Sequence, residues 1–286
     1  MTIDPAKLLA IRISAEQRFS ERDAILYALA VGYGHDPLDA AGLRYCYEEG
    51  LRAAPTLPIV LGHPGFWMRD LDTGIDWRRV VHGEQELHLH GPIPVSGHVT
   101  SETRVVDVID KGAGRGAVVI FDRVVADAST GTPIATMRQS NFCRGDGGFG
   151  GPTRPIAKPT DLPGGAPDHV VLLPTRPETA LLYRMSADLN PLHADPAAAR
   201  RAGFDRPILH GLASFGLVAH ALTKASCGYD GGRLKRMAGR FTGAIFPGET
   251  VRTEIWDRGG VLHFQALVHE RDAPLMGNGI AETRAA

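Results

Sequence analysis

The feature that most constrains the fold is a segment dense in glycine and proline near the middle of the chain. Residues 145–167 read GDGGFGGPTRPIAKPTDLPGGAP, without the periodic apolar positions of a helix or strand. Such a segment is typical of an ordered or semi-extended linker. It divides the 286 residues into parts of similar size, and this length suffices for two ordinary domains. We therefore predict domains at 1–150 and 168–286, joined by a linker at 151–167.

The two parts repeat one order of expected elements. The first contains ELHLHGPIPVSGHVTSETRVVDVI followed by GRGAVVIFDRVVADASTGTPIATMRQS, and the second contains MAGRFTGAIFPGETVRTEIWD followed by GGVLHFQALVHERDAPLMGNG. Each pair predicts a short strand, a turn and further strands, with hairpin turns at ASTGTP and ERDAP. We interpret this pattern as a duplicated unit.

A helix is expected ahead of these strands in each part. In SERDAILYALAVG, Ser20 is a suitable N-cap with Asp23 three residues on, and the helix ends near Gly32. HGLASFGLVAHALTKAS places five apolar residues on one stripe: Leu212, Phe215, Val218, Ala219 and Leu222. An apolar helix followed by a long antiparallel sheet predicts an α+β fold in which the sheet wraps around the helix.

The composition is globular and excludes several classes of partner. The chain is 43% hydrophobic and 22% charged, and its 31 Lys plus Arg nearly balance its 32 Asp plus Glu, so we expect no nucleic-acid or membrane partner. The three cysteines, Cys46, Cys143 and Cys227, are widely spaced and form no CxxC pair. They favour a reducing compartment, and the N-terminal residues lack the apolar core of a signal peptide. We therefore expect a cytoplasmic protein.

One short stretch, YRMSADLNPLHADP at residues 183–196, gathers two carboxylates, an Asn-Pro pair and a histidine. A purely structural interpretation exists for most of it. Asp195 followed by Pro196 is a typical helix start. Asp188 and Asn190 would stabilise the Asn-Pro turn, and a single histidine is more often a satisfied polar residue than a catalyst.

The combination also suits acid/base chemistry. Asp188 and His193 on one loop can hold a water from two sides, take one of its protons and return a proton to a substrate. In RPILHGLASFG, Gly211 opens the apolar helix, and its N–H is a natural donor to an oxyanion on a carbonyl. Asp188, His193 and Asp195 could also cluster around a metal. We expect none, because no second histidine lies at i+4 and no cysteine is near. Ser214 fits the GxSxG nucleophile pattern poorly.

SADLNPLHADP followed by RPILHGLASFG resembles the hydratase 2 signature of the MaoC-like (R)-specific enoyl-CoA hydratases. LYALAVGYGHD, VVHGEQ, VIDKGAGRGAVV, RGDGGFGG and GRFTGAIFPGE resemble the two-domain form of that family, so the resemblance spans nearly the whole chain. It implies a double hot dog fold, in which each of two tandem units wraps an antiparallel sheet around a central helix. It also implies reversible hydration of trans-2-enoyl-CoA to (3R)-3-hydroxyacyl-CoA by a homodimer. No metal or redox cofactor is expected, and CoA is part of the substrate.

The resemblance assigns roles to individual residues. Asp188 and His193 would be the acid/base pair, Asn190 would hold the site in shape, and the Gly211 N–H would polarise the thioester carbonyl. Eight further residues are expected to contact the acyl-CoA: His82, Gly83, Lys111, Leu189, Pro191, Leu192, His210 and Phe241. Without the resemblance, Lys111 would be a solvated hairpin charge and Phe241 a core residue.

Two departures from the family pattern bear on these expectations. Ala187 stands where the family usually has glycine, which would strain the loop if that position needs a positive φ. The first part has His35 and Asp36 but no DxNxxH spacing, so we expect one active site per chain. The first part would then be a wall for the acyl tail, with room for long or bulky groups. Two alternatives stay open: an acyl-CoA thioesterase, and a non-catalytic protein that binds acyl thioesters.

Overall fold

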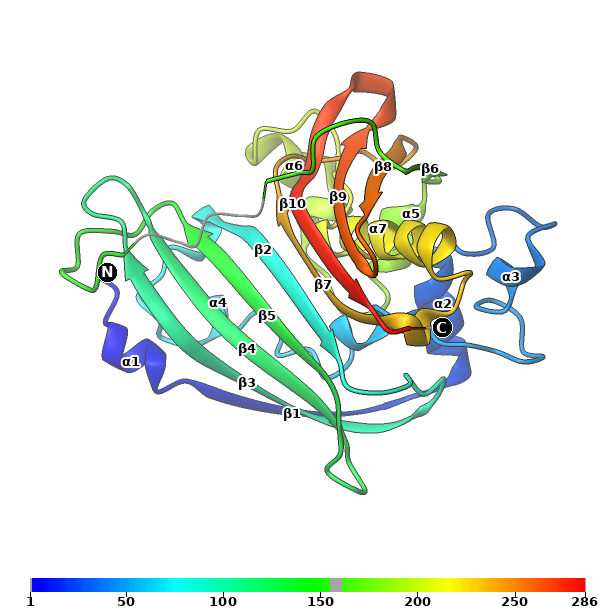
Figure 1. Cartoon of the computed structure of the whole chain (residues 1–286). Coiled ribbons are helices and arrows are strands. Elements are labelled where there is room, and N and C mark those ends of the chain that lie inside the picture. Colours follow the sequence, from blue (N-terminus) through cyan, green and yellow to red (C-terminus); the bar gives the residue numbers. More distant parts are fainter. Residues whose placement is uncertain (1, 155–160, 286) are drawn as a thin grey trace.

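The described part of the chain forms one antiparallel sheet of ten strands with helices packed against it (Figure 1). The computed structural model describes residues 2–154 and 161–285. The elements in chain order are α1 (Pro5–Leu9), β1 (Arg12–Phe19), α2 (Glu21–Ala30), α3 (Ala40–Leu43), η1 (Leu57–Ile59), α4 (Trp67–Asp70), η2 (Trp77–Arg79), β2 (Val80–Leu89), β3 (Gly97–Asp110), β4 (Ala117–Asp127), β5 (Pro133–Cys143), β6 (His169–Pro174), α5 (Thr179–Tyr183), η3 (Pro191–His193), α6 (Pro196–Arg201), α7 (Gly211–Ser226), η4 (Gly231–Arg233), β7 (Leu234–Phe241), β8 (Thr250–Asp257), β9 (Val261–Val268), η5 (His269–Arg271) and β10 (Ala273–Thr283).

The strand order confirms the predicted duplication. The sheet runs β1-β3-β4-β5-β2-β7-β10-β9-β8-β6, so each half has its first strand at the edge and its second strand at the centre. The two halves join where β2 pairs antiparallel with β7, with Glu84 opposite Arg240 and Glu86 opposite Ala238. The edge strands β1 and β6, which precede the helices, were not predicted from the sequence. The alternation of β1 was missed: Ile13, Ala15 and Phe19 lie on its less exposed face, and the residues that alternate with this face are polar and exposed. β6 has six residues, of which only Leu173 is buried, so it shows no such pattern.

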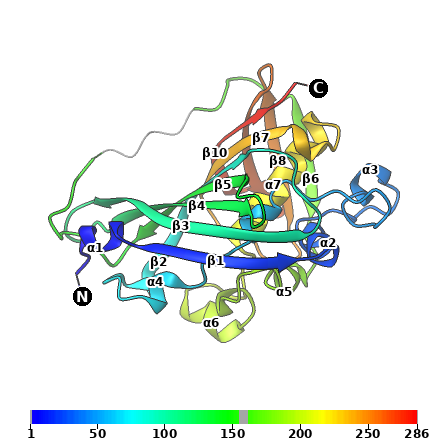
Figure 2. The same ribbon diagram turned by 90° about the horizontal axis from the view of Figure 1, so that it is seen from below.

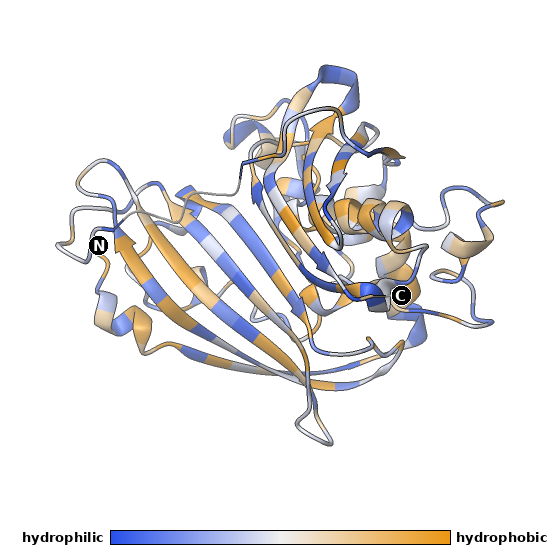
Figure 3. Ribbon diagram, in the orientation of Figure 1, coloured by the Kyte–Doolittle hydropathy of each residue, from blue (hydrophilic) through white to orange (hydrophobic). Residues whose placement is uncertain are grey.

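The central helix of the second half is α7, with 16 residues (Figure 3 colours it mostly hydrophobic). The predicted stripe was too narrow, because every residue from Ala213 to Thr223 is buried. The sheet covers one side of α7, and the first-half helix α2 approaches the other. A Cβ on Gly216 would lie 2.5 Å from Val31 Cγ1, so only glycine permits this approach. The predicted Ser20–Asp23 capping box of α2 is confirmed.

The helix of the first half is shorter than α7, in agreement with the predicted start at Ser20 and end near Gly32. This helix, α2, has only 10 residues and ends where Gly32 takes a positive φ. Short elements between α2 and β2 cover the rest of the inner sheet face, and Figure 2 shows α4 against these strands. Two apolar clusters result: one contains Val125 and continues into the second half, and the other joins Phe121 to Trp67 of α4.

Part of the glycine-rich segment belongs to the first half rather than to a linker. The Asp110 carboxylate accepts hydrogen bonds from the N–H groups of Gly112, Gly148 and Gly150, and Asp110 N–H donates to the Pro152 carbonyl. These bonds fasten the segment after β5 to the β3–β4 turn. Residues 155–160 of the predicted linker lie outside the described residues, so the boundaries at 150 and 168 stay a prediction. None of the helices in the described ranges is long and apolar enough to cross a bilayer.

Candidate active site

The loop between α5 and α6 holds the predicted motif in a network of local hydrogen bonds. Asp188 Oδ1 accepts from Asn190 N–H at 2.9 Å, and Asn190 Oδ1 accepts from Leu192 N–H at 3.0 Å. Asp195 caps α6 by accepting from Ala197 N–H at 2.8 Å, as predicted. Asp188 Oδ2 makes no hydrogen bond with any described residue, so one carboxylate oxygen shapes the turn and the other is free to act.

His193 is buried and its tautomer is fixed. Its Nδ1 lies 2.8 Å from the Ile208 carbonyl oxygen, which can only accept, so Nδ1 carries the proton in the neutral ring. The lone pair is therefore on Nε2. Burial lowers the pKa of His193, although the Ile208 hydrogen bond and the Asp188 charge both oppose this shift. His193 thus carries a neutral, basic Nε2 at neutral pH.

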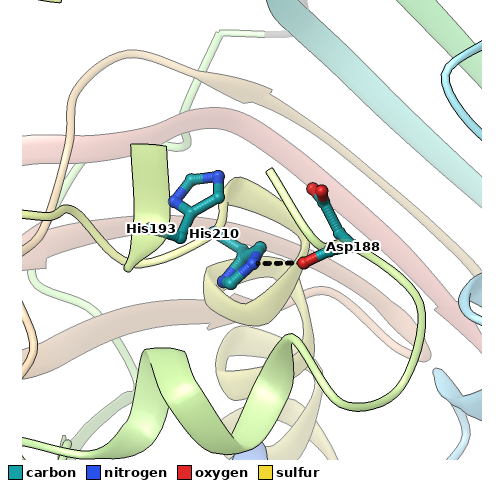
Figure 4. A group of neighbouring side chains, drawn as sticks. All are labelled: Asp188, His193 and His210. Atoms are coloured by element: carbon teal, nitrogen blue, oxygen red, sulfur yellow. Dashed lines mark hydrogen bonds between the residues drawn. The ribbon is translucent and has the colours of Figure 1, made fainter. Parts of the chain in front are cut away.

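His210 completes a group of three side chains (Figure 4). Its Nε2–H donates to the Asp188 backbone carbonyl at 3.1 Å, and its ring stacks on His193 with centroids 3.7 Å apart. Burial and the neighbouring His193 lower the pKa of His210 to about 3. One carboxylate oxygen and one nitrogen of each ring lie within 4.8 Å of one another. A water making two hydrogen bonds bridges atoms up to about 5.5 Å apart, so it fits between Asp188 and His193.

The same three residues have the donor types of a metal site, with His210 in the place where the sequence suggested Asp195. The ring planes do not suit that use. The two imidazoles stack at 28°, so their in-plane lone pairs run side by side instead of converging on one point. That no metal is bound stays a prediction.

Gly211 begins α7 beside an aromatic wall. Its N–H has no partner inside the helix and none among the other described residues. The Phe241 ring lies 3.4 Å from where a Gly211 Cβ would be, and His82 packs edge-on against Phe241 with centroids 4.7 Å apart. The His82 Nε2–H donates to the Glu84 carbonyl across the bulge at Gly83. Burial lowers the pKa of His82 to about 4, and Asp188 opposes that shift, so His82 lies near the loop.

Of the remaining residues predicted to contact the acyl-CoA, three lie on the same loop as Asp188 and His193, and one lies far from it. Leu189 and Pro191 are exposed, and Leu192 is half-buried on the same loop. Lys111 follows the end of β3. From there the sheet continues through β4 and β5 to the start of β2, so three strand spacings separate Lys111 from that start. With strands about 4.8 Å apart, Lys111 is about 14 Å from that start. The structure does not bring Lys111 to the catalytic group, and its predicted contact with the ligand would be to a distant part of CoA.

Three residues near the site had no signal in the sequence. His63 Nδ1 accepts from Gly65 N–H at 3.1 Å, so its neutral ring carries the proton on Nε2. Burial and Arg123 lower the pKa of His63 to about 4, and Asp188 opposes them. Tyr183 packs against His210 at 4.8 Å, with a hydroxyl that lacks a partner among the described residues. His63 and Arg123 come from the first half, where no motif marks them.

Ala187 does not strain the loop. The described non-glycine residues with positive φ are Tyr229, Asp272 and Asn278, so Ala187 adopts an ordinary backbone conformation. It packs against the apolar cluster that contains α7. The expected strain is therefore absent, because this loop does not need a left-handed residue before Asp188.

Comparison with known proteins extends over both halves. Residues 18–145 match the MFE-2 hydratase 2 N-terminal domain, and residues 159–275 match the MaoC like domain. A "Probable enoyl-CoA hydratase 2" of Dictyostelium discoideum is 35% identical over 293 residues, covering 98% of this chain and 97% of that relative. The "3-hydroxyacyl-thioester dehydratase Y" of Mycobacterium tuberculosis is 35% identical over 257 residues, covering 90% and 88%.

The crystal structure of a MaoC-like dehydratase from Phytophthora capsici superposes with a TM-score of 0.85 at 30% identity, covering 99% of this chain and 98% of that one. The expected double hot dog fold is thereby confirmed, with a shortened helix in the first unit. Since these relatives are matched over nearly their whole length, the chain belongs to the family of two-domain MaoC-like dehydratases whose first half is a hydratase 2 N-terminal domain.

Proposed function

We propose that this protein reversibly hydrates trans-2-enoyl-CoA to (3R)-3-hydroxyacyl-CoA. The observation that carries the proposal is that one carboxylate oxygen of Asp188 and one ring nitrogen of His193 lie within 4.8 Å on one loop. His193 Nε2 and Asp188 Oδ2 both lack a hydrogen-bond partner among the described residues. The neighbouring α7 starts with the unpaired Gly211 N–H. The names of the relatives, enoyl-CoA hydratase 2 and 3-hydroxyacyl-thioester dehydratase, describe the two directions of this reaction.

The thioester carbonyl accepts a hydrogen bond from Gly211 N–H. The helix α7 has 16 residues, and its aligned peptide dipoles place partial positive charge on that N–H. The carbonyl oxygen gains negative charge as water adds to the β-carbon, so this donor binds the transition state more tightly than the substrate. The Phe241 ring beside Gly211 keeps bulk water away from the donor.

A single water lies between Asp188 and His193 as the reaction starts. Its oxygen bonds to the β-carbon while one of its protons passes to His193 Nε2, and the double-bond electrons move onto the thioester oxygen. The Asp188 carboxylate stabilises the imidazolium that forms. The proton then passes from Nε2 to the α-carbon on the same face, which restores neutral His193 and leaves the other proton on the new hydroxyl. In this scheme Asp188 stays ionised throughout, and His193 serves first as the base and then as the acid.

Several finer features belong to the proposal. Addition of water needs only the acid/base pair and the oxyanion donor, so we expect no metal or redox cofactor, with CoA as part of the substrate. The edge strand β6 exposes Val170 and Leu172, and such an edge favours pairing with a second copy in a homodimer. The cysteines Cys46, Cys143 and Cys227 are unpaired, which supports a reducing location such as the cytoplasm.

The direct test follows the ultraviolet absorbance of the conjugated thioester. Crotonyl-CoA and a longer trans-2-enoyl-CoA should both lose absorbance without releasing free thiol. Asp188→Asn and His193→Ala should each lower kcat on the order of 100-fold or more. Asp195→Asn is the matched control, because it changes a carboxylate of the same loop to another good N-cap and should leave kcat unchanged.

Two outcomes would replace the proposal. Release of free thiol at the rate of absorbance loss would identify a thioesterase, in which water attacks the carbonyl itself. Tight binding of enoyl-CoA without turnover, unaffected by Asp188→Asn, would identify a protein that binds acyl thioesters without acting on them.

A further inference from the structure

Arg123 of β4 is a buried cation without a counter-ion in the part of the chain that the structure describes. Only 7% of its surface is exposed. Its guanidinium donates to the backbone carbonyls of Ile59 and Leu61, and it forms no ion pair with a described carboxylate. Burial lowers the pKa of Arg123 to about 10, so the side chain stays charged at neutral pH. Burying an unpaired charge is costly, and two carbonyl contacts offset only part of the cost.

Arg123 lies in a polar band on the inner face of the first-half sheet. Phe121 and Val125, two residues away on the same face, belong to the two separate apolar clusters, so Arg123 marks the gap between them. The band runs diagonally across the strands: Thr103 stands opposite Arg123, and the pair Gln139–Gln85 lies one inward-facing position further along β5, because Arg123 itself is opposite Met137. Asn141 follows Gln139 at the next inward-facing position of β5. Asn141 stands opposite His82, so the polar band runs from Arg123 towards the catalytic loop. The buried Thr103 hydroxyl has no partner among the described residues.

The guanidinium and the catalytic carboxylate share two neighbours. Burial is the main cause that shifts the pKa of His63 downwards and the pKa of Tyr183 upwards. On both groups the Arg123 charge acts to lower the pKa, and the Asp188 charge acts to raise it. His63 and Tyr183 thus lie within the field of both charged groups. Tyr183 also packs against His210 of the site. The hydrogen bond from Arg123 to the Leu61 carbonyl, two residues before His63, agrees with the proximity of Arg123 to His63.

The chemistry of the substrate fixes which end of it faces Arg123. This step rests on the proposed function. CoA is large and carries several phosphate charges, so it must leave the site on the exposed side, where Met185 and Leu189 are 68% and 59% exposed. The acyl chain, which begins between Asp188, His193 and Gly211, then points to the buried side. The buried groups near that end of the site include Tyr183, which packs against His210, and Arg123, which is bonded to the chain just before His63.

We propose that Arg123 is a specificity-determining residue that selects acyl chains carrying a carboxylate beyond the reacting double bond. A guanidinium binds a carboxylate through two parallel N–H···O bonds, which suits a planar, desolvated partner. The substrate then supplies the counter-ion that the described residues lack, and the Thr103 hydroxyl, which has no partner among them, can donate to the same group. A purely aliphatic chain in this position leaves the guanidinium desolvated and unpaired, so the site discriminates against it.

The first experiment uses the unaltered protein. kcat/KM is measured for a homologous series of trans-2-enoyl-CoAs that end in a carboxylate, for the methyl esters of the same acids, and for unsubstituted chains of equal length. At one chain length the carboxylate should be preferred by on the order of 10- to 100-fold over both uncharged analogues. Equal values throughout the series, or a preference for the unsubstituted chain at every length, would overturn the inference.

The second experiment changes the charge. Arg123→Met should abolish the preference mainly by raising KM for the carboxylate substrate, and Arg123→Lys should keep part of it. Arg138→Met is the matched control, because Arg138 pairs with Asp122 on the outer face of the same strands and should leave the preference intact. If Arg123→Met instead slows all substrates equally, Arg123 only holds Ile59 and Leu61 in place, and the inference fails.

Hydration of crotonyl-CoA separates this inference from the proposed function. Turnover of crotonyl-CoA without any carboxylate preference removes only the inference. If no substrate turns over, calorimetric binding of a saturated carboxyacyl-CoA against its methyl ester still tests Arg123. Tighter binding of the charged ligand, lost in Arg123→Met, supports the inference, and equal binding overturns it.

Discussion

At the scale of single residues, the two carboxylate oxygens of Asp188 have different roles. Oδ1 accepts the Asn190 N–H and shapes the turn, and Oδ2 remains free beside His193. The structural and the catalytic interpretations of the motif are therefore compatible, because the turn fixes the direction of the free oxygen. The Ile208 carbonyl does the same for His193 by holding its Nδ1–H. Each catalytic group is oriented by backbone atoms rather than by another side chain.

The direction in which the pKa of His193 is shifted can be predicted. Burial lowers its pKa below the ordinary 6.5, and the Asp188 charge works in the opposite direction. Proton NMR of the ring should therefore give a pKa below 6.5, and Asp188→Asn should lower it further. In the proposed mechanism neutral His193 is the active form, so kcat/KM should fall only at pH values below that pKa. A rise of the His193 pKa in Asp188→Asn would contradict this account.

At the scale of elements, the sequence predicts the helices and strands that have a local pattern, and it misses those that depend on contacts between distant parts of the chain. The strands after each helix, the Ser20–Asp23 cap and the Asp195 cap follow from local patterns. The end of α2 near Gly32 follows from a local signal as well, and the alternation of β1 is a local signal that was missed. The edge strand β6 does not follow from such a pattern, because its pairing with the distant β8 determines it. The same holds for the site: the motif predicts its second-half residues, but His63 and Arg123 reach it only through the folding of the first half.

The contact between α2 and α7 depends on the absence of one side chain. In Gly216→Ala the new Cβ would lie 2.5 Å from Val31 Cγ1 and 3.2 Å from the Tyr27 hydroxyl. The free energy of unfolding should fall by roughly 1–3 kcal/mol, although alanine gains about 1 kcal/mol over glycine in a helix. Urea unfolding measures the change, and adding Val31→Ala should restore part of it. A Gly216→Ala protein more stable than the wild type would mean that the helices have room.

At the scale of the whole molecule, the two hot dog units form a single continuous sheet. Ion pairs reinforce the pairing of β2 with β7: Glu84 with Arg240 at 2.6 Å and Glu86 with Arg236 at 2.6 Å. Both pairs are partly exposed, so each contributes only about 1 kcal/mol. Most of the coupling between the halves comes from the apolar cluster that extends from Val125 into α7. The site lies inside this coupled body and takes residues from both halves.

Acid should destabilise the whole molecule. Burial is the main cause that holds five histidines below their ordinary pKa: His63, His82, His193, His210 and His220. The unfolded chain therefore binds more protons than the folded chain below pH 6.5, and the free energy of unfolding falls as pH decreases. Each histidine contributes up to about 1.4 kcal/mol per pH unit in this range. Urea unfolding near neutral pH and one to two units lower measures the loss.

The control for this prediction is His90→Gln, because His90 is exposed. It should leave the pH dependence of the unfolding free energy unchanged, whereas His220→Gln, if folded, should make it shallower. Stability that stays constant or increases on acidification would show that these rings are solvated.

The repeated strand order has a consequence for how such proteins diversify. The proposed acid/base pair belongs to the second unit, and the polar band to which we assign substrate selection belongs to the first. The first unit carries neither residue of that pair, so its inner face away from His63 and His82 can change while the pair stays in place, as long as its central strand still fits β7. Recombining the first unit of one relative with the second unit of another would then give hybrid enzymes that catalyse the same reaction on different substrates. Such hybrids must keep complementary residues at the junction of β2 and β7, where the ion pairs Glu84–Arg240 and Glu86–Arg236 lie.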